Sequence, residues 1–437
     1  MLRDVLKAVA DGNLGNALTR LWVLAEGCED GSQRLSRWLN DWNHNAHEGR
    51  VRAYVAALAS YQGQLPDDAA EHPLALIEAL DASHAERRSL AVVAEGAAPE
   101  LEIGERRYHL LRRIVDGAAK PAAEARSPNL EEWFRHFRVV PDRVELGGAS
   151  VEIRLEFLGR IARTPPPVDA GLRLRISHFT DPTVLALDVH EGNLSFLVTG
   201  ANPAEIREQS LKAEVQTVRD AAAHLWLAPE LTISIGLRSQ VERWLATDPA
   251  ADLLLCVPGS CHEDDGGGRV NRAIVLNGSG QRKARQDKCS QFCFPAQVGE
   301  LHEGIAAARR LILLVTPIGT VGVAICKDYF DGTADGLIRA AWDRLAPDWM
   351  LVPSMGHGDT RAAHDRRAKE NWELRRTRTL VANQEPRMPG ESPEPVPGFV
   401  RRGAMVETVA PGGSSLAPRD DDPPLSAGRR PRLTRIK

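Results

Sequence analysis

The sequence has few cysteines, no long uninterrupted apolar run and no large excess of charge of one sign. Six cysteines among 437 residues do not suggest a disulfide framework, which favours a reducing compartment. The apolar run at residues 311–326 is interrupted by Thr, Pro and Gly, so we expect no membrane span. The N-terminus mixes charges into its apolar positions, unlike a signal peptide. We therefore expect a cytoplasmic protein without a membrane partner.

Charge and composition exclude further classes. The formal net charge is -4 and the sequence pI is near 6.4, so no nucleic-acid partner is expected, although a local basic patch remains open. Hydrophobic residues make up 43% and charged residues 26%, as in soluble globular proteins. The glycines at 266–268 lack the strand-to-helix context of a phosphate or dinucleotide loop. We expect no organic cofactor.

The length predicts two domains and a tail. Apolar residues at helical spacing predict a mainly helical N-terminal region, residues 1–167, with a few strands near its end, such as 151–157. Prolines 165–167 mark its boundary. A second domain is expected at 181–413, and residues 414–437 are expected to be a disordered tail. The default role of the N-terminal region is binding a protein partner.

A cysteine follows a predicted strand hairpin. Residues 311–315 and 321–325 are short, apolar and rich in β-branched side chains, and Pro317 and Gly319 provide turn chemistry between them. Cys326 comes directly after the second run. A reactive thiol needs a fixed backbone and an opening to solvent, and the end of a buried strand offers both. Cys326 is therefore a candidate nucleophile.

A glutamate and a lysine lie upstream in comparable settings. A predicted strand at 194–198, a helix and the run 225–228 lead to Glu230, and this order suggests a layered α/β fold. Further predicted strands at 252–258 and 271–276 precede a glycine turn and then Lys288. The sequence thus places a carboxylate, an amine and a thiol at strand ends or after a hairpin.

The segment from Gly322 to Asp328, Gly-Val-Ala-Ile-Cys-Lys-Asp, resembles the cysteine motif of the nitrilase superfamily of carbon-nitrogen hydrolases. The resemblance covers residues 193–413. It implies an α-β-β-α sandwich in which Glu230 is the general base, Lys288 the lysine and Cys326 the nucleophile. Glu263 resembles the family's second glutamate, which holds the lysine or positions the leaving group. Members of the family commonly form dimers, so the resemblance also implies a homo-oligomer.

The resemblance implies hydrolysis of a non-peptide carbon-nitrogen bond, an amide in a small molecule, without metal or cofactor. Glu230 would take the thiol proton, and the thiolate of Cys326 would form a thioester. Lys288 and the backbone N–H of Lys327 would stabilise the oxyanion. Lys327 stands where many relatives have an aromatic residue, a change that favours an acidic substrate or leaves this side chain in solvent.

Several alternatives stay open. Lys283 competes with Lys288 as the site lysine. The thioester could pass to an amine instead of water, as in an acyltransferase. The domain could also be an inert scaffold or sensor that acts through a protein partner of the N-terminal region. A zinc site is disfavoured because the candidate cysteines are spaced more widely than CxxC pairs; these are Cys256, Cys261, Cys289 and Cys293.

Overall fold

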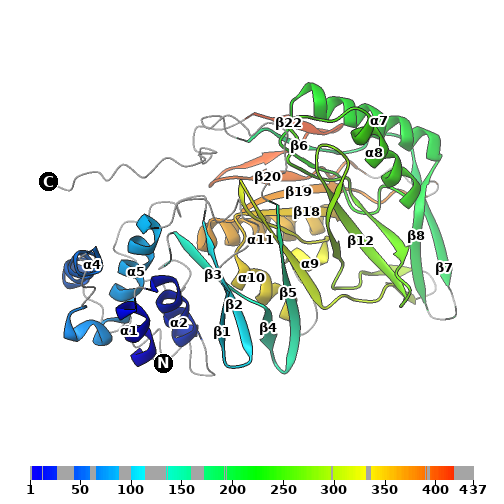
Figure 1. Cartoon of the computed structure of the whole chain (residues 1–437). Helices are drawn as coiled ribbons and strands as arrows, with labels where there is room; N and C mark the ends of the chain where they lie inside the picture. Colours follow the sequence, from blue (N-terminus) through cyan, green and yellow to red (C-terminus); the bar gives the residue numbers. More distant parts are fainter. Residues whose placement is uncertain are drawn as a thin grey trace. The chain divides into compact units, whose positions relative to one another are not determined.

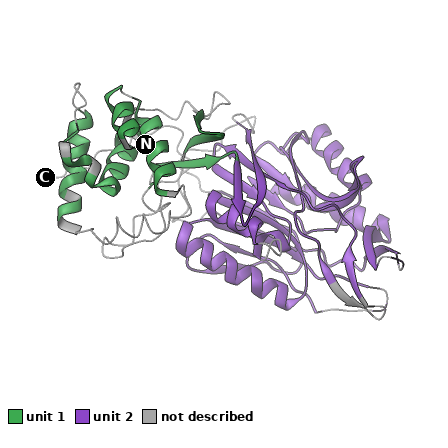
Figure 2. Ribbon diagram, turned by 90° about the horizontal axis from the view of Figure 1, so that it is seen from below, with its two compact units in different colours: residues 1–142, 428–437 green, residues 143–427 purple. Residues whose placement is uncertain are grey.

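The structure is a computed structural model. It describes residues 2–11, 13–26, 44–59, 65–87, 100–113, 134, 136–158, 172–190, 192, 194–296, 299–330, 336–388, 390 and 394–417. The chain divides into two compact units, which Figure 2 shows in different colours. Unit 1 contains residues 1–142 and unit 2 begins at Arg143. Each unit is described by itself.

Unit 1 combines helices with a small antiparallel sheet. Its helices are α1 (Leu2–Ala10), α2 (Leu14–Glu26), α4 (His44–Ala59), the 3-10 helix η1 (Asp67–Glu71) and α5 (Pro73–Arg87). The sheet has the order β1 (Glu100–Ile103), β2 (Arg106–Arg112) and β3 (Phe137–Pro141). Helix and strand residues share one apolar core that includes Leu18, Trp22 and Tyr108. The Asp81 carboxylate accepts the backbone N–H groups of His136 and Phe137, which ties α5 to the start of β3.

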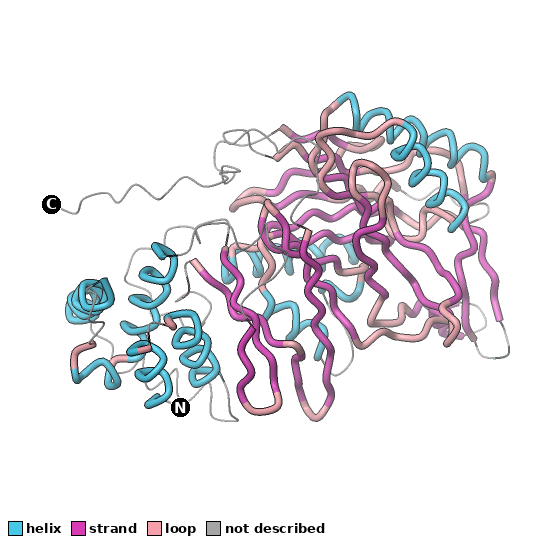
Figure 3. The backbone as a smooth tube through the Cα atoms, in the orientation of Figure 1, coloured by secondary structure: helices cyan, strands magenta, loops and turns pink. Residues whose placement is uncertain are grey.

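Unit 2 is built on two large sheets and a smaller one (Figure 1 and Figure 3). The β12 sheet has the order β11 (Ser260–Asp264), β12 (Arg269–Leu276), β10 (Leu255–Val257), β9 (Leu225–Leu227), β6 (Leu174–Ile176) and β22 (Ser414–Leu416), and β13 (Arg282–Asp287) pairs with β12. The β18 sheet has the order β21 (Val406–Thr408), β20 (Phe399–Arg401), β19 (Arg378–Gln384), β18 (Trp349–Met355), β17 (Gly319–Val323), β16 (Arg310–Thr316), β5 (Ala149–Phe157) and β4 (Arg143–Leu146). The smaller sheet has the order β14 (Cys293–Ala296), β15 (Gly299–Glu303), β8 (Ser195–Asn202) and β7 (Val184–His190).

The two large sheets share one hydrophobic core. Leu225 and Leu227 of β9 face this core together with Val323 and Leu351 of the β18 sheet. Trp226, between the two leucines, lies in a different cluster. This alternation follows from the two-residue period of a strand, which sends successive side chains to opposite faces.

Helices cover the outer faces. The cluster that holds Trp226 also contains apolar residues of α7 (Ala204–Asp220) and α8 (Ile235–Thr247), which therefore pack on the β12 sheet. On the β18 sheet, α10 (Leu337–Leu345) contacts β4 and β5, and α11 (Gly358–Arg375) contacts β19. The short helix α9 (Lys327–Phe330) contacts both α10 and α11. The predicted α/β class is confirmed. No helix in the described ranges combines the length and apolar character needed to cross a bilayer.

The division between the units differs from the predicted one. Strands β4 and β5 fall in residues that the sequence assigned to the N-terminal region, yet they belong to unit 2. The reason is that β5 pairs in parallel with β16, from Arg310↔Glu152 to Val315↔Phe157, a partner that no local pattern identifies. The proline connector at 165–167 lies outside the described residues.

The first residues of the predicted disordered tail form a strand. Residues Ser414–Leu416 form β22, which pairs antiparallel with β6, so the sheet continues past residue 413. Gly412 and Gly413 have φ values of 84° and 88°, which suit glycine and turn the chain toward β6. A Cβ at Gly413 would lie 2.6 Å from the Ile176 carbonyl oxygen, so this close approach also requires glycine. Residues 418–437 of the predicted tail lie outside the described residues.

Candidate active site

Cys326 lies just beyond the predicted hairpin. Strands β16 and β17 pair antiparallel, with Thr316 opposite Gly319, which confirms the two strands and their turn. Cys326 has a φ of 48°, in the left-handed region that residues other than glycine rarely adopt. Its N–H donates to the Pro353 carbonyl, and α9 begins at the next residue. The backbone thus turns sharply at the thiol, and the side chain is buried, with 2% exposed.

Glu230 reaches the same end of the two sheets. It follows β9, and its N–H donates to the carbonyl of Ser354, the residue after the one that binds Cys326. Two consecutive carbonyls at the end of β18 therefore anchor the candidate base and the candidate nucleophile. Gly259 allows the backbone just before Glu230 to pass close to residue 259, because a Cβ at this position would lie 2.5 Å from the Pro229 carbonyl oxygen.

Lys288 brings the amine into this region. It follows β13, and its N–H donates to the Asn271 carbonyl on β12. Its Nζ lies 2.8 Å from Oε1 of Glu230 and 2.7 Å from Oε2 of Glu303, and all three side chains are almost fully buried. The structure therefore joins the predicted glutamate and the predicted lysine in one ion pair.

Glu303, at the end of β15, completes a buried cluster that the sequence did not reveal. Its Oε2 also accepts the Phe292 N–H at 3.1 Å. Its Oε1 accepts from Nδ2 of Asn271 and from Nε2 of His262, both at 2.8 Å. The Asn271 Nδ2 also donates to Oε1 of Glu230, at 2.9 Å. We call Glu230, Asn271, Lys288 and Glu303 the acid–lysine cluster.

His262 has a defined tautomer in this arrangement. Its Nδ1 lies 2.8 Å from the Val198 N–H and must accept that hydrogen bond. The ring proton is therefore on Nε2, which donates to Glu303. His262 thus links β8 to the acid–lysine cluster as a hydrogen-bond donor.

The charges of the cluster hold one another in place. Burial alone would lower the pKa of Lys288, but the charges of Glu230 and Glu303 outweigh it and hold this pKa well above its usual range. Burial alone would raise the pKa of Glu303, but Lys288 and the His262 hydrogen bond lower it to about 2. Glu303 is therefore a permanent anion, and Lys288 is a permanent cation near neutral pH.

The thiol interacts with this cluster. Burial, followed by the negative charge of Glu230, raises the pKa of Cys326 to about 12, and the positive charge of Lys288 acts in the opposite direction. The resting side chain is therefore a thiol rather than a thiolate. Because Cys326 and Glu230 are anchored to consecutive carbonyls of β18 and Lys288 binds Glu230, the structure brings the three predicted residues to one region.

A second group of side chains contacts the sulfur. The Ser354 hydroxyl lies 3.6 Å from Sγ of Cys326 and can donate to it. The same hydroxyl lies 2.9 Å from Nε2 of His364 and 3.0 Å from Oδ1 of Asn383. Burial lowers the pKa of His364 to about 3, so this imidazole is neutral near pH 7. Its Nδ1 has no hydrogen-bond partner within the described residues, which favours placing the single proton on Nε2, toward Ser354.

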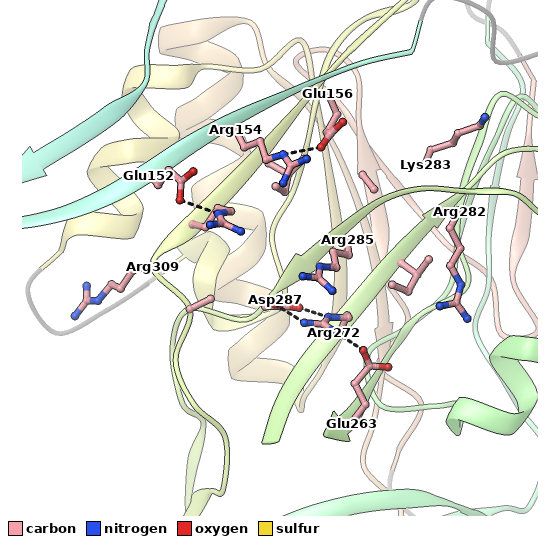
Figure 4. Close-up of a pocket in the computed structure, with 15 residues that line it drawn as sticks. Glu152, Arg154, Glu156, Glu263, Arg272, Arg282, Lys283, Arg285, Asp287 and Arg309 are labelled. Atoms are coloured by element: carbon pink, nitrogen blue, oxygen red, sulfur yellow. Dashed lines mark hydrogen bonds and ion pairs between the residues drawn. The ribbon is translucent and has the colours of Figure 1, made fainter. Parts of the chain in front are cut away.

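Glu263 is not where the family resemblance placed it. Its carboxylate binds Arg238 and Arg272, each at 2.6 Å, and Figure 4 shows it beside Arg272. Side chains alternate along β11, so Glu263 faces away from its neighbour His262, which contacts the cluster. Of the two roles predicted for Glu263, that of holding the lysine is wrong, because Glu303 binds Lys288, and that of positioning the leaving group stays a prediction.

Lys283 is also outside the cluster. Its Nζ lies 3.0 Å from Oε1 of Gln281, and the side chain lines a groove with Arg285 (Figure 4). It precedes Lys288 by five residues and is partly exposed on β13, whereas Lys288 is 1% exposed. The structure therefore favours Lys288 between these two candidates.

The residues missed from the sequence carried weak signals. Glu303 is one of two glutamates in the short run 299–303, and nothing local shows which of them turns inward. Asn271 and His262 look like ordinary strand residues. Ser354 has one signal, because it ends the buried run 350–353 next to the predicted nucleophile strand. These contacts are set by strand pairing across the sheets.

The remaining described cysteines do not cluster. Cys256, Cys261, Cys289 and Cys293 are free thiols, and Cys256 is fully buried within β10. Among the described residues, no group of three or more His, Cys, Asp or Glu side chains is placed to hold a metal ion.

Comparison with known proteins gives structural neighbours only. No family model matches the chain, and no curated protein matches it. Among solved structures, the chain is similar to the NitFhit protein of C. elegans, at 17% identity and a TM-score of 0.41, over 57% of this chain and 61% of that one. The chain thus spans about three fifths of the length of NitFhit.

Two further neighbours are described as members of the nitrilase superfamily. Nit3 of Saccharomyces cerevisiae matches at 16% identity and a TM-score of 0.38, over 58% of this chain and 93% of that one. A mutant of the amidase from Nesterenkonia AN1 matches at 16% identity and a TM-score of 0.34, over 58% of this chain and 89% of that one.

Proposed function

We propose that unit 2 hydrolyses a non-peptide carbon-nitrogen bond, an amide in a small molecule, through a thioester on Cys326. In this proposal the layers of unit 2 are those of a nitrilase-like α-β-β-α sandwich. The observation that supports it most is the ion pairing of Lys288 with Glu230 and Glu303. The charges of Glu230 and Lys288 also act on the pKa of the Cys326 thiol, in opposite directions. An acid, a base and a nucleophile are what this reaction needs.

The hydrogen bonds favour Glu230 as the base. Both of its bonds, from Lys288 and Asn271, go to Oε1 and neither uses Oε2. All four bonds of Glu303 engage both of its oxygens, and its low pKa makes it a poor proton acceptor. Glu230 Oε2 would take the proton of Cys326, whose pKa of about 12 makes an assisting base necessary near neutral pH.

The thiolate would attack the amide carbon, and Lys288 with the N–H of Lys327 would stabilise the oxyanion. One such donor typically contributes about 10²–10³ in rate. Glu230 would then give its proton to the departing amine and activate the water that cleaves the thioester. Glu303 would position Lys288, because its two oxygens fix the ammonium and the Asn271 amide together. We propose this positioning role in place of the one predicted for Glu263.

Alkylation of the full-length protein by 2-chloroacetamide, followed by intact-mass analysis and peptide mapping, tests this proposal. We expect one fast adduct, on Cys326, which disappears in Cys326→Ser and slows in Glu230→Gln. Cys293 is the internal comparison, since it is a free and partly exposed thiol. The proposal fails if Cys326 reacts no faster than Cys293, or if Glu230→Gln leaves its rate unchanged.

A further inference from the structure

Unit 2 also has a groove lined by strands of both large sheets. Edge strand β13 forms one side, and β5 and β16 form the other (Figure 4). The groove has a volume of about 750 Å³, within the range of small-molecule pockets, and Ile274, Ala284 and Ile312 give it an apolar part. We call it the basic groove.

The basic groove has an excess of positive charge. Seven of its fifteen lining residues are arginine or lysine and four are glutamate or aspartate, and Arg282 among the seven is paired with Glu242 at 2.8 Å, which leaves two positive charges in excess. The chain as a whole carries a formal net charge of -4. Positive charge is therefore concentrated in the groove although the chain as a whole is negatively charged, and a concave surface focuses the resulting electric field.

The carboxylates of the groove are already paired. Glu152 binds Arg310 and Glu156 binds Arg154, both at 2.8 Å. Arg272 binds Glu263 at 2.6 Å and Asp287 at 2.5 Å. None of these four carboxylates is left to neutralise the cations of β13.

Two cations of β13 lack a close ion pair in the described structure. Lys283 bonds to the neutral amide of Gln281. Arg285 lies 4.0 Å from Asp265, but Arg272 binds that carboxylate at 3.0 Å. Both cations can therefore bind an added anion without breaking a strong ion pair.

The two sides of the groove are fixed to each other. The Gln286 side chain donates to the Arg310 carbonyl at 3.0 Å and accepts from the Ile312 N–H at 2.9 Å. This residue is 2% exposed, and its side chain joins β13 to β16. The two strands are therefore held at a fixed spacing before a ligand binds, which reduces the cost of ordering the groove.

We propose that the basic groove binds a small polyanion with two or more phosphate groups, such as a nucleoside diphosphate. Arginine forks match phosphate oxygens, and an excess of two positive charges suits a diphosphate better than a single carboxylate. The site is separate from the acid–lysine cluster, because Glu263 and Asp287 face the groove whereas the adjacent residues His262 and Lys288 contact Glu303. The inference goes beyond the proposed hydrolase reaction and does not depend on it.

Isothermal titration calorimetry on the full-length protein at low ionic strength tests this site with ADP and inorganic pyrophosphate. We expect both to bind with one site per chain and adenosine not to bind. The double variant Lys283→Glu with Arg285→Glu should weaken binding by roughly tenfold or more, since hydrogen bonds to charged groups are lost. The matched control is Arg366→Glu with Lys369→Glu, an equal charge change at exposed positions of α11, which should bind as the unmodified protein does.

Several results would overturn this inference. Absence of binding by both ADP and pyrophosphate would do so, as would equal binding by the β13 double variant. Citrate that binds as tightly as pyrophosphate would show that the groove selects charge and not phosphate. Loss of ADP binding in Cys326→Ala would place the anion at the candidate active site instead, whereas retained binding supports a separate site and leaves the hydrolase proposal to its own test.

Discussion

Glu230 and Glu303 share the same two hydrogen-bond donors, Nζ of Lys288 and Nδ2 of Asn271. Their environments nevertheless differ. Glu303 accepts two further bonds, from His262 and the Phe292 N–H, whereas both bonds to Glu230 go to a single oxygen. In the proposed reaction the two carboxylates around this lysine would therefore have different tasks: Glu303 would fix the cation, and Glu230 would keep one oxygen for proton transfer.

Glutamine substitution should separate these two tasks. In Glu230→Gln the amide oxygen can keep the bonds from Lys288 and Asn271, so the fold should persist, while Cys326 alkylation slows by about 10²-fold or more. In Glu303→Gln an amide NH₂ replaces one carboxylate oxygen, and this donor then faces other donors, either Lys288 or the pair His262 and Asn271. Stability should therefore fall by roughly 3–5 kcal/mol, as when a buried ion pair loses one partner. Urea unfolding and the alkylation rate measure the two effects. Equal stability losses in the two variants would contradict this assignment.

Ser354→Ala should make Cys326 less reactive without removing the base. The hydroxyl can turn from Asn383 to the sulfur once the thiolate forms, because His364 supplies the proton that Ser354 accepts. Loss of one hydrogen bond to a charged group should slow alkylation by roughly tenfold or more and move the rate–pH profile to higher pH.

A buried hydroxyl far from the sulfur provides the comparison for Ser354. Thr320 binds Asp348 near the start of β17, whereas Cys326 follows the end of that strand. Thr320→Ala should change stability but leave the alkylation profile in place. If the two alanine variants shift the profile equally, the effect is structural and Ser354 does not position the thiol.

The sequence was sufficient for the parts of the site that local pattern determines. A strand followed by Cys326, a strand followed by Glu230 and a hairpin followed by Lys288 are each contained in about ten residues, and all three lie in one region. The second carboxylate could not be found this way. Glu263 and Glu303 both lie in β-strand segments. Which of them contacts Lys288 depends on the pairing of β15 with β8 and on the side of the sheet toward which each β11 side chain points.

The dependence on long-range strand pairing also explains why the predicted domain boundary and the predicted start of the tail differ from the observed ones. Strand β5 alternates clearly in sequence, but its membership of unit 2 depends on pairing with β16, more than 150 residues later. Strand β22 is three residues in a polar, proline-rich stretch, and only its pairing with β6 makes it a strand. Long-range strand pairing therefore determines the assignment of β5 and β22, which local strand propensity does not predict.

Asp328 should make stability depend on pH. Burial raises the pKa of its carboxyl from 3.8 to about 7, despite hydrogen bonds from Ser290 and the Cys289 N–H. Between these values the native state keeps a proton that the unfolded chain has lost, so this group reduces stability as pH rises from about 4 to about 7. Asp328→Asn removes the titration, and its stability relative to the unmodified protein should rise across that window.

Urea unfolding at several pH values between about 4 and about 8 measures this difference. The Asn amide can keep both contacts, accepting from the Cys289 N–H and donating to Ser290, so packing should be preserved. Asp359→Asn, at an exposed position of α11, is the control and should show no such rise. A constant difference between Asp328→Asn and the unmodified protein would show that Asp328 is ionised throughout.

Cys326→Gly should be more stable than Cys326→Ala, although glycine normally destabilises relative to alanine. The φ of 48° at this position costs an L-residue about 1–2 kcal/mol and costs glycine little. Both variants lack the sulfur, so the comparison isolates the backbone, and we expect a difference of about 1 kcal/mol in urea unfolding. Ala324→Gly, two residues earlier and without a positive φ, should show the usual opposite sign. If both glycine variants are less stable than their alanine counterparts, Cys326 is not strained. If the order inverts only at Cys326, the chain maintains an unfavourable conformation at the candidate nucleophile, as expected of a functional site.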